Sequence, residues 1–167
     1  MLNDKLHSYN IYRNGNTLTG IADEIDLPGI EFISDTISGY GIAGEIDDPT
    51  MGLTKSLEWE LKFKTLYEDV AIDPTKVDTY TVRGSQQGRD ATGNIGYSGI
   101  KAVLQGRPKS LMPGTLKAGS PTNPSVKYEI TYYKLEVDGK VIFEIDKFNS
   151  ICIMNGVDIL ADMKKFL

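Results

Sequence analysis

The sequence predicts a single, mostly β domain over residues 1–167, with one short internal helix and a short C-terminal helix. Several short segments alternate apolar and polar residues, which is the pattern of half-buried strands. Glycine supplies 17 of the 167 residues, above the usual share of about 7%, and many glycines fall between these segments, where turns form. Asn14-Gly15 and Asp138-Gly139 are signals of antiparallel hairpins.

The N-terminal part of the chain predicts a hairpin followed by an irregular passage. Residues 8–13 form the first expected strand, and Asn14-Gly15 turns the chain into a second one, TLTGIADEIDLP. From Pro28 the sequence is extended in character. Residues 39–55 are rich in glycine and acidic residues and have no clear periodicity. We expect this passage to be a long loop or a hairpin tip.

The clearest alternation lies in the segment SLEWELKFK. Its apolar residues share one face of a strand and its charged residues share the other: Leu57, Trp59, Leu61 and Phe63 against Glu58, Glu60, Lys62 and Lys64. This pattern predicts a half-buried strand. The following residues, TLYEDVAID, favour one or two helical turns that end at Asp73-Pro74.

The second half of the chain predicts further strands. VDTYTVRG and IGYSGIKAVLQGR flank a DATGN turn, and VKYEITYYKLEV and KVIFEID flank Asp138-Gly139. Residues 108–124 contain several prolines, so we expect a loop that is no central strand. The end of the chain, NGVDILADMKKFL, predicts a short amphipathic helix with Leu160, Met163 and Leu167 on one side.

Composition excludes several classes of function. The 18 basic and 23 acidic side chains give a net charge of −5, which provides no basic surface for tight binding of nucleic acid. No stretch approaches the roughly 18 apolar residues of a membrane span, and the start of the chain lacks a signal-peptide pattern. Cys152 is the only cysteine, so we expect a small buried side chain in a reducing cytoplasm.

The sequence contains no convincing catalytic, cofactor or metal site. Residues 39–44 match G-x-G-x-x-G, but the Asp47-Asp48-Pro49 that follows opposes the helix a dinucleotide site requires. The segment KLEVDGKVIFE is similar to a calcium loop, but counting from Gly139 puts Lys134 at the first ligand position and Ile145 at the last, so a hairpin is favoured. His7 is the only histidine. We therefore expect no enzyme, no cofactor and no metal.

Paired carboxylates are the least unlikely catalytic groups. Glu58 and Glu60 share a strand face and Asp47 and Asp48 are adjacent, as an acid–base pair requires. A solvated strand face that also carries lysines explains the first pair more simply. Serine, threonine and lysine side chains are numerous, but none has an activating partner or a nucleophile-elbow motif.

Four segments in order resemble the major tail tube protein family of contractile bacteriophage tails. They are YNIYRNGNTLTGIADEIDLPGIE, SGYGIAGEID, SLEWELK and YKLEVDGKVIFEIDKFNSICIMNGVDIL. The resemblance covers nearly the whole chain and implies a small antiparallel β-barrel or sandwich. It also implies hexameric rings that stack into the inner tube of a contractile tail, with a channel for DNA passage or membrane puncture.

The resemblance implies partners and a location. Partners are other copies of the chain together with sheath, baseplate and tape-measure-type proteins, and DNA passes through the lumen without tight binding. The location is a virion tail or a phage-tail-like particle assembled in the cytoplasm of a bacterial host.

Two sets of contact residues follow from the loop and from the alternation of side chains. We expect residues 39–55 to join rings, because a long aperiodic segment usually serves a function. The residues expected to make inter-ring contacts are Gly39, Tyr40, Gly41, Gly44, Asp47, Asp48, Met51 and Lys55. The residues opposite the apolar faces of their strands, expected to face the lumen, are Glu58, Glu60, Lys62, Lys127, Glu129 and Thr131.

Other interpretations stay open at this point. A noncontractile tail, a phage-derived bacteriocin or a secretion machine would use a similar tube subunit. A β-barrel module that binds oligonucleotides or sugars would need a basic groove with exposed aromatic residues, and the net charge of −5 has the wrong sign. An enzyme is the third alternative.

Overall fold

The computed structural model describes residues 2–167 and confirms the mostly β class. Over these residues the strands are β1 Leu2–Arg13, β2 Asn16–Thr17, β3 Phe32–Ser38, β4 Glu45–Thr54, β5 Leu57–Lys62, β6 Asp78–Arg89, β7 Ile95–Met112, β8 Ser125–Val137, β9 Lys140–Asp146, β10 Ile151–Met154 and β11 Val157–Asp158. The helical elements are the 3₁₀ turn η1, Glu68–Val70, and α1, Ala161–Lys164.

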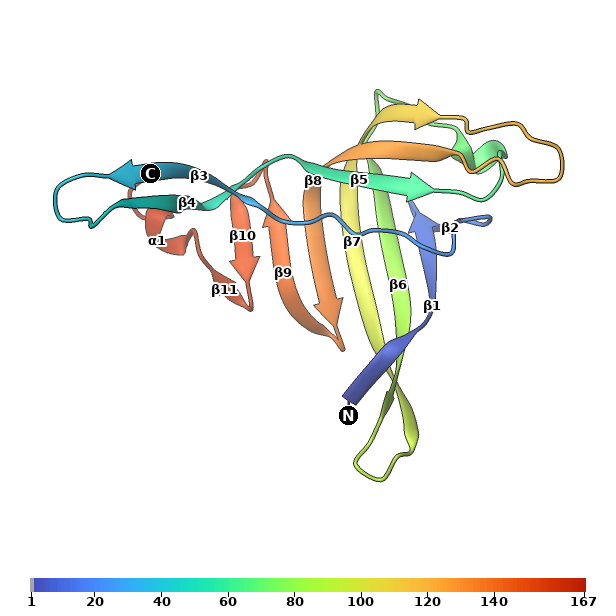
Figure 1. The fold of residues 1–167 in the computed structure, drawn as a ribbon, viewed down its shortest axis with the longest axis horizontal. Helices are drawn as coiled ribbons and strands as arrows, with labels where there is room; N and C mark the ends of the chain where they lie inside the picture. The colour runs from blue at the N-terminus through green and yellow to red at the C-terminus, as the bar shows by residue number, and fades with distance from the viewer. Residues whose placement is uncertain (1) are drawn as a thin grey trace.

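One large antiparallel sheet forms the body of the molecule. Its strand order is β11-β10-β9-β8-β7-β6-β1-β2, and β5 pairs with β8 outside this path. The first half of β8 pairs with β5, from Ser125 to Ile130, and its second half pairs with β9 from Tyr132 onward. The sheet therefore bends along β8, and β5 runs across the strands of the main sheet as a second layer (Figure 1).

Gly106 marks the bend in β7. The pairing of β7 with β8 shifts register between Gln105 and Gly106, and a Cβ at Gly106 would lie 2.1 Å from the carbonyl oxygen of Glu129. Only glycine permits this approach of two backbones. Within residues 2–167 the two layers pack face to face as a sandwich and do not close into a barrel.

The core between the layers is rich in aromatic residues. Trp59 of β5 packs on Tyr80 of β6 and Tyr128 of β8, with ring centroids 5.0 and 6.1 Å apart, and all three side chains are fully buried. The predicted alternation in β5 is confirmed, because Leu57, Trp59, Leu61 and Phe63 are each at most 1% exposed. Val126, Tyr128 and Ile130 of β8 are also fully buried.

A chain of hydrogen bonds links Arg13, Tyr80, Tyr128 and Asp78 in this core, while Trp59 Nε1 is buried without a hydrogen-bond partner. Arg13 Nε donates to the Tyr80 hydroxyl at 2.8 Å, the Tyr80 hydroxyl contacts that of Tyr128, and Tyr128 donates to Asp78 Oδ2 at 3.5 Å. Burial raises the pKa of both tyrosines, so both stay protonated. These contacts fix β1, β6 and β8 to one another, because an unpaired hydroxyl would be costly in such a core.

The structure differs from the expectations at several elements. Pro108 was expected to begin a loop, but β7 continues to Met112. Pairing of β6 with β7 ends at Gly106, so residues 107–112 form an edge where the missing N–H of Pro108 is tolerated. The second strand of the first hairpin is only Asn16–Thr17, and residues 18–31 run on as an extended segment.

The helical elements are short, as expected. The internal helix is the single turn η1, and α1 spans only four residues. Leu160 is buried, but Met163 is 43% and Leu167 is 97% exposed, so the single chain covers only the first of the three apolar residues expected on one side of the helix. Isolated helices of this length have little intrinsic stability, which agrees with the short α1.

A two-stranded hairpin of β3 and β4, which we call the arm, projects from the body (Figure 1). Its register runs from Phe32↔Thr54 to Ser38↔Glu45, with residues 39–44 as the turn. The passage 39–55 thus consists of a hairpin tip and the β4 strand. At the base of the arm a Cβ on Gly52 would meet the Leu160 side chain at 2.3 Å, so the arm and the chain end pack closely.

Candidate assembly surfaces

The tip of the arm carries the first four residues expected to make inter-ring contacts. Gly39, Gly41 and Gly44 have φ angles of 139°, 92° and 107°, which favour glycine, and Tyr40 is fully exposed between them. The G-x-G-x-x-G match is therefore a hairpin turn that leads into β4 and opens no helix. An aromatic side chain at such a tip is well placed for contact with another molecule.

The arm is acidic along its length. Between residues 32 and 54 the sequence has no lysine or arginine and has four carboxylates: Asp35, Glu45, Asp47 and Asp48. Asp35 lies directly opposite Asp48 across the two strands. Like charges in this position destabilise a sheet, so the isolated arm carries unfavourable electrostatics that a basic partner would relieve.

Apolar side chains are exposed beside these carboxylates. Ile37 pairs with Ile46 on the arm, and the two are 43% and 49% exposed. Ile33, Met51 and Leu53 are also about half exposed. Exposed apolar residues gathered on one projecting element are typical of a surface that becomes buried on association.

The remaining residues of the inter-ring set lie at different places on the arm. Asp47 and Asp48 lie in β4, and Met51 lines a cavity at the base together with Leu160. Lys55 follows β4, where its Nζ is 2.7 Å from Glu31 Oε1, and this hydrogen bond raises its pKa. The Lys55 side chain is therefore held by an ion pair within its own chain, whereas Tyr40 at the tip is fully exposed.

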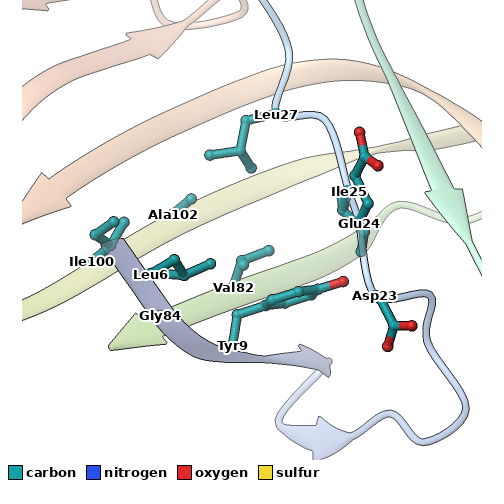
Figure 2. A pocket seen from close by; sticks show the side chains of 10 residues that line it. All are labelled: Leu6, Tyr9, Asp23, Glu24, Ile25, Leu27, Val82, Gly84, Ile100 and Ala102. Atoms are coloured by element: carbon teal, nitrogen blue, oxygen red, sulfur yellow. The ribbon is translucent and has the colours of Figure 1, made fainter. Parts of the chain in front are cut away.

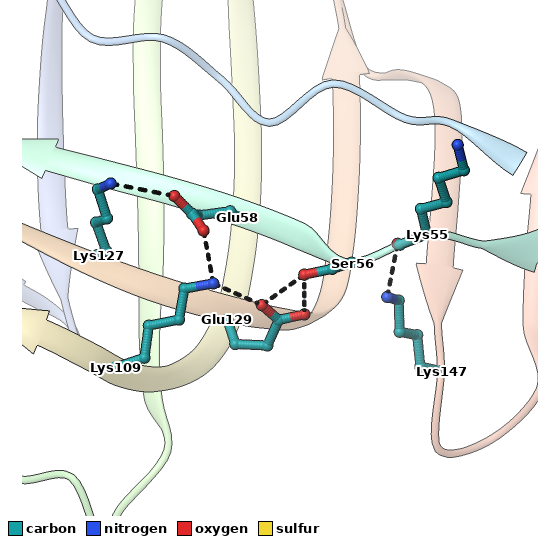
Figure 3. A network of polar contacts seen from close by, with 7 residues as sticks. All are labelled: Lys55, Ser56, Glu58, Lys109, Lys127, Glu129 and Lys147. Atoms are coloured by element: carbon teal, nitrogen blue, oxygen red, sulfur yellow. Dashed lines mark hydrogen bonds and ion pairs between the residues drawn. The ribbon is translucent and has the colours of Figure 1, made fainter.

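The outer face of the β5 layer carries a network of ion pairs (Figure 3). Lys109 Nζ lies 2.6 Å from Glu58 and 3.2 Å from Glu129, Lys127 lies 3.5 Å from Glu58, and Ser56 donates to Glu129 at 2.7 Å. The hydrogen bond from Lys109 lowers the pKa of Glu58, and the same bond raises the pKa of Lys109. The network pairs Lys109 and Lys127 with carboxylates on this face.

The residues expected to face the lumen lie on or beside this network. Glu58, Lys127 and Glu129 belong to it, Lys62 is 3.9 Å from Asp26, and Thr131 lies at the bend, where its hydroxyl donates to Gln105 O at 3.4 Å. Glu60 pairs in register with Lys127. Sequence reasoning missed Lys109, because Pro108 suggested a loop there.

The outer face of the long sheet is a second polar surface. Arg83 of β6 lies opposite Lys101 of β7, and Lys101 lies opposite Glu136 of β8. Lys134 is 3.0 Å from Glu136, and its hydrogen bond lowers the pKa of that carboxyl. This face mixes both signs of charge and exposes few apolar groups.

An apolar groove opens at the β1 side of the molecule (Figure 2). Its volume is about 240 Å³, and its lining residues come from β1, β6, β7 and the segment between β2 and β3. Leu6 and Leu27 at its rim are 48% and 38% exposed, and Asp23 and Glu24 stand along one side. No sequence signal identified it, because the lining residues belong to segments far apart in the chain.

Within residues 2–167, none of the helices has the length and apolar content needed to cross a membrane. In the same range, no group of three or more histidine, cysteine, aspartate or glutamate side chains is placed to hold a metal ion.

A β-sandwich with a projecting acidic and apolar arm is typical of a subunit that associates with other molecules. A model of the family described as phage tail tube protein FII matches residues 3–167. The chain belongs to this family, and it is a structural subunit of a tail tube. Tail tube proteins polymerise into tubes.

Individual relatives agree with this assignment. The tail tube protein of Escherichia phage P2 is 32% identical over 172 residues, which cover 96% of this chain and 95% of the relative. The major tail tube protein of Serratia phage KSP20 is 37% identical over 71 residues, covering 40% of this chain and 42% of that protein.

A solved structure shares the fold. It is the cryo-EM structure of an extracellular contractile injection system, the PVC sheath/tube terminator in its extended state, with a TM-score of 0.53. The match covers 78% of this chain and 94% of the other at 11% identity, and therefore shows the fold alone.

Proposed function

We propose that this subunit forms hexameric rings that stack into the inner tube of a contractile tail, where the tube is the channel for DNA passage or membrane puncture. The observation that carries the proposal is the arm, which projects from the body of this tail tube family member and bears exposed isoleucines and exposed carboxylates. Such a surface requires a partner, and stacked copies would supply it.

The arm is the element that we propose joins one ring to the next. Its tip, with Gly39, Tyr40, Gly41 and Gly44, and its acidic residues Asp47 and Asp48 would reach the neighbouring ring. Met51 and Lys55 would support the base of the arm, since Lys55 is bonded to Glu31. The sheath, the baseplate and a tape-measure-type protein are further partners of such a tube.

We propose that the outer face of the β5 layer faces the lumen. On this face Glu58 and Glu129 pair with Lys109 and Lys127, so these two lysines would be less available to hold DNA through release of counterions. The net charge of −5 supports the same conclusion. DNA would then slide through a neutral to negative channel without tight binding, in a virion tail or a similar particle assembled in the host cytoplasm.

The proposed role is structural and involves no catalysis. Negative-stain electron microscopy of the purified chain tests the assembly directly. Rings of sixfold symmetry and tubes of uniform width are expected. Monomers alone, at concentrations where related tubes assemble, would contradict the proposal. Copurification of a sheath protein with the tube distinguishes a contractile particle from a noncontractile one.

A further inference from the structure

The apolar groove on the β1 side is a binding surface that the single chain leaves open. Figure 2 shows Leu6, Val82, Ile100 and Ala102 lining its floor and Leu27 at its rim. Its volume of about 240 Å³ lies below the range of roughly 300–1,000 Å³ that is usual for small-molecule sites. A groove of this size suits one or two apolar side chains from another polypeptide.

The topology of the sheet places a suitable segment at the opposite side of the molecule. In the strand order, β1 lies near one edge, whereas β10, β11 and then α1 lie at the other (Figure 1). A ring of identical subunits uses head-to-tail contacts, in which one edge of each copy meets the other edge of the next. The groove of one copy then faces the α1 side of its neighbour.

Residues 164–167 have the chemistry that the groove requires. Phe166 and Leu167 are 89% and 97% exposed, and they follow Lys164 and Lys165. The lysines are held only by exposed ion pairs, at 4.0 Å from Asp158 and 2.7 Å from Asp162, which contribute little stability. An apolar pair next to two cations complements an apolar groove that has two carboxylates along one side.

The tip of the arm is the main rival occupant, and charge disfavours it. Tyr40 is fully exposed, but the arm carries four carboxylates and no cation. Those carboxylates would approach Asp23 and Glu24 at the groove, and like charges brought together oppose association.

We propose that the groove binds Phe166 and Leu167 of the adjacent copy in the same ring, with Lys164 and Lys165 facing Asp23 and Glu24. This inference rests on the proposed ring assembly and adds a lateral contact to it. Glu24 is the more available carboxylate, because Asp23 lies 2.7 Å from Lys64 of its own chain. The contact would anchor each subunit to the next through a buried aromatic side chain.

Disulfide cross-linking tests the contact in assembled tubes. The native Cys152 is fully buried, so introduced cysteines can be paired selectively. Leu27→Cys combined with Phe166→Cys should give a covalent ladder that ends at the closed ring after oxidation. The control pair, Leu27→Cys with Tyr40→Cys, places the second thiol on the arm tip and should stay monomeric on a non-reducing gel.

Each outcome of this experiment decides the proposal. A ladder from the first pair alone supports it. A ladder from the Tyr40→Cys pair would assign the groove to the arm and overturn it, as would tubes of normal width in which the first pair gives no intermolecular bond. Absence of rings and tubes from the unaltered chain would instead remove the proposed function, and the lateral contact with it.

Charge reversal provides an independent test. Glu24→Lys should raise the protein concentration needed for assembly by roughly tenfold. The substitution removes the attraction of Glu24 for the lysines of the adjacent copy and puts a repelling charge in its place. Adding Lys164→Glu and Lys165→Glu to the same chain should restore assembly toward its original concentration. A failure of the combined variant to recover, while it remains folded by circular dichroism, would contradict the pairing of these charges.

Discussion

Gly106 and Glu129 form the closest backbone approach at the bend of the main sheet. A Cβ on Gly106 would stand 2.1 Å from the Glu129 carbonyl oxygen and 2.9 Å from its carbonyl carbon. The register of β7 with β8 shifts at this same point. The bend allows β5 to cross the main sheet and cover its core, so the position of one glycine determines where the second layer begins.

Gly106→Ala is therefore expected to be strongly destabilising. The added methyl group meets backbone that cannot rotate away, and overpacking of this kind costs about 1–3 kcal/mol in the free energy of unfolding. Urea denaturation measures the loss. Gly99→Ala in the same strand is the matched control, because nothing lies within 4 Å of a Cβ there. Equal stability of the two variants would show that the bend does not depend on this contact.

Alternation along the chain predicted the parts of the fold that depend on local burial. The inward set of β5 and the hairpin at Asp138-Gly139 follow from residue order alone, because one face of each strand is buried. The bend at Gly106 could not be predicted in this way. A glycine within a strand signals a bulge or a close approach, but only the partner strand shows which one.

The assembly surfaces were predictable in part. The absence of periodicity at residues 39–55 indicated a special segment, and the structure places its tip at the end of the arm. The network around Lys109 was missed, because Pro108 suggested a loop where an unpaired edge tolerates proline. The groove required knowledge of tertiary contacts, since Leu6, Leu27 and Ile100 come from three separate segments.

The turn between β6 and β7 should respond to acid through Asp90. Thr92 and Asn94 each donate hydrogen bonds to Asp90 from their side chain and their backbone N–H. These bonds lower the pKa of Asp90 from 3.8 to about 2. A carboxyl with a lowered pKa contributes stability that is present above its unfolded pKa, near 3.8, and is lost as the pH falls through about 2. NMR titration of the Asp90 side chain should give a midpoint near the lower value.

Two variants separate the causes of this shift. Thr92→Ala removes the hydroxyl that donates to Asp90 at 2.7 Å, the largest contribution, and should raise the midpoint clearly. Asn94→Ala keeps the backbone N–H that donates at 2.9 Å and should raise it less. The opposite order would contradict the assignment of the hydroxyl as the main cause.

Neutralising the facing carboxylates of the arm should have opposite effects on the subunit and on the tube. Asp35→Asn with Asp48→Asn removes a like-charge pair worth about 0.2–1 kcal/mol, so β3 and β4 should exchange amide hydrogens more slowly in the unassembled subunit. The same change removes the charge offered to a basic partner. Fewer or shorter tubes are expected by electron microscopy.

Glu45→Gln is the control for this double variant. Glu45 pairs with Ser38, so its neutralisation relieves no repulsion between the two strands. Its hydrogen exchange should match that of the unaltered subunit. Tubes of normal length and stability from the double variant would show that Asp35 and Asp48 play no part in stacking.

Cysteine labelling identifies which sheet face forms the wall of the channel. Glu60→Cys lies on the β5 layer, and Arg83→Cys lies on the outer face of the long sheet. In assembled tubes Glu60→Cys should react with a small maleimide but resist a polymer-linked maleimide too large to enter the ends. Arg83→Cys should not show this selective protection. The reverse pattern would place the long sheet on the lumen side.

Truncation separates the structural and assembly roles of the chain end. Leu160 is 5% exposed and packs in a small cluster with Ile145 and Cys152, so Leu160→Ala should cost about 2–3 kcal/mol, at the low end for a buried leucine. Deletion of residues 158–167 removes this side chain and should destabilise the fold, as measured by urea denaturation.

A shorter deletion tests the assembly role alone. Deletion of residues 161–167 keeps Leu160 and removes only residues whose side chains are exposed or half-exposed. The shorter deletion should leave stability within about 0.5 kcal/mol, because changes at exposed positions usually have small effects. Its tubes should form poorly, because the segment that bears Phe166 is gone. If the shorter deletion unfolds the subunit, the exposed end belongs to the core; if it assembles normally, the end has no role in the tube.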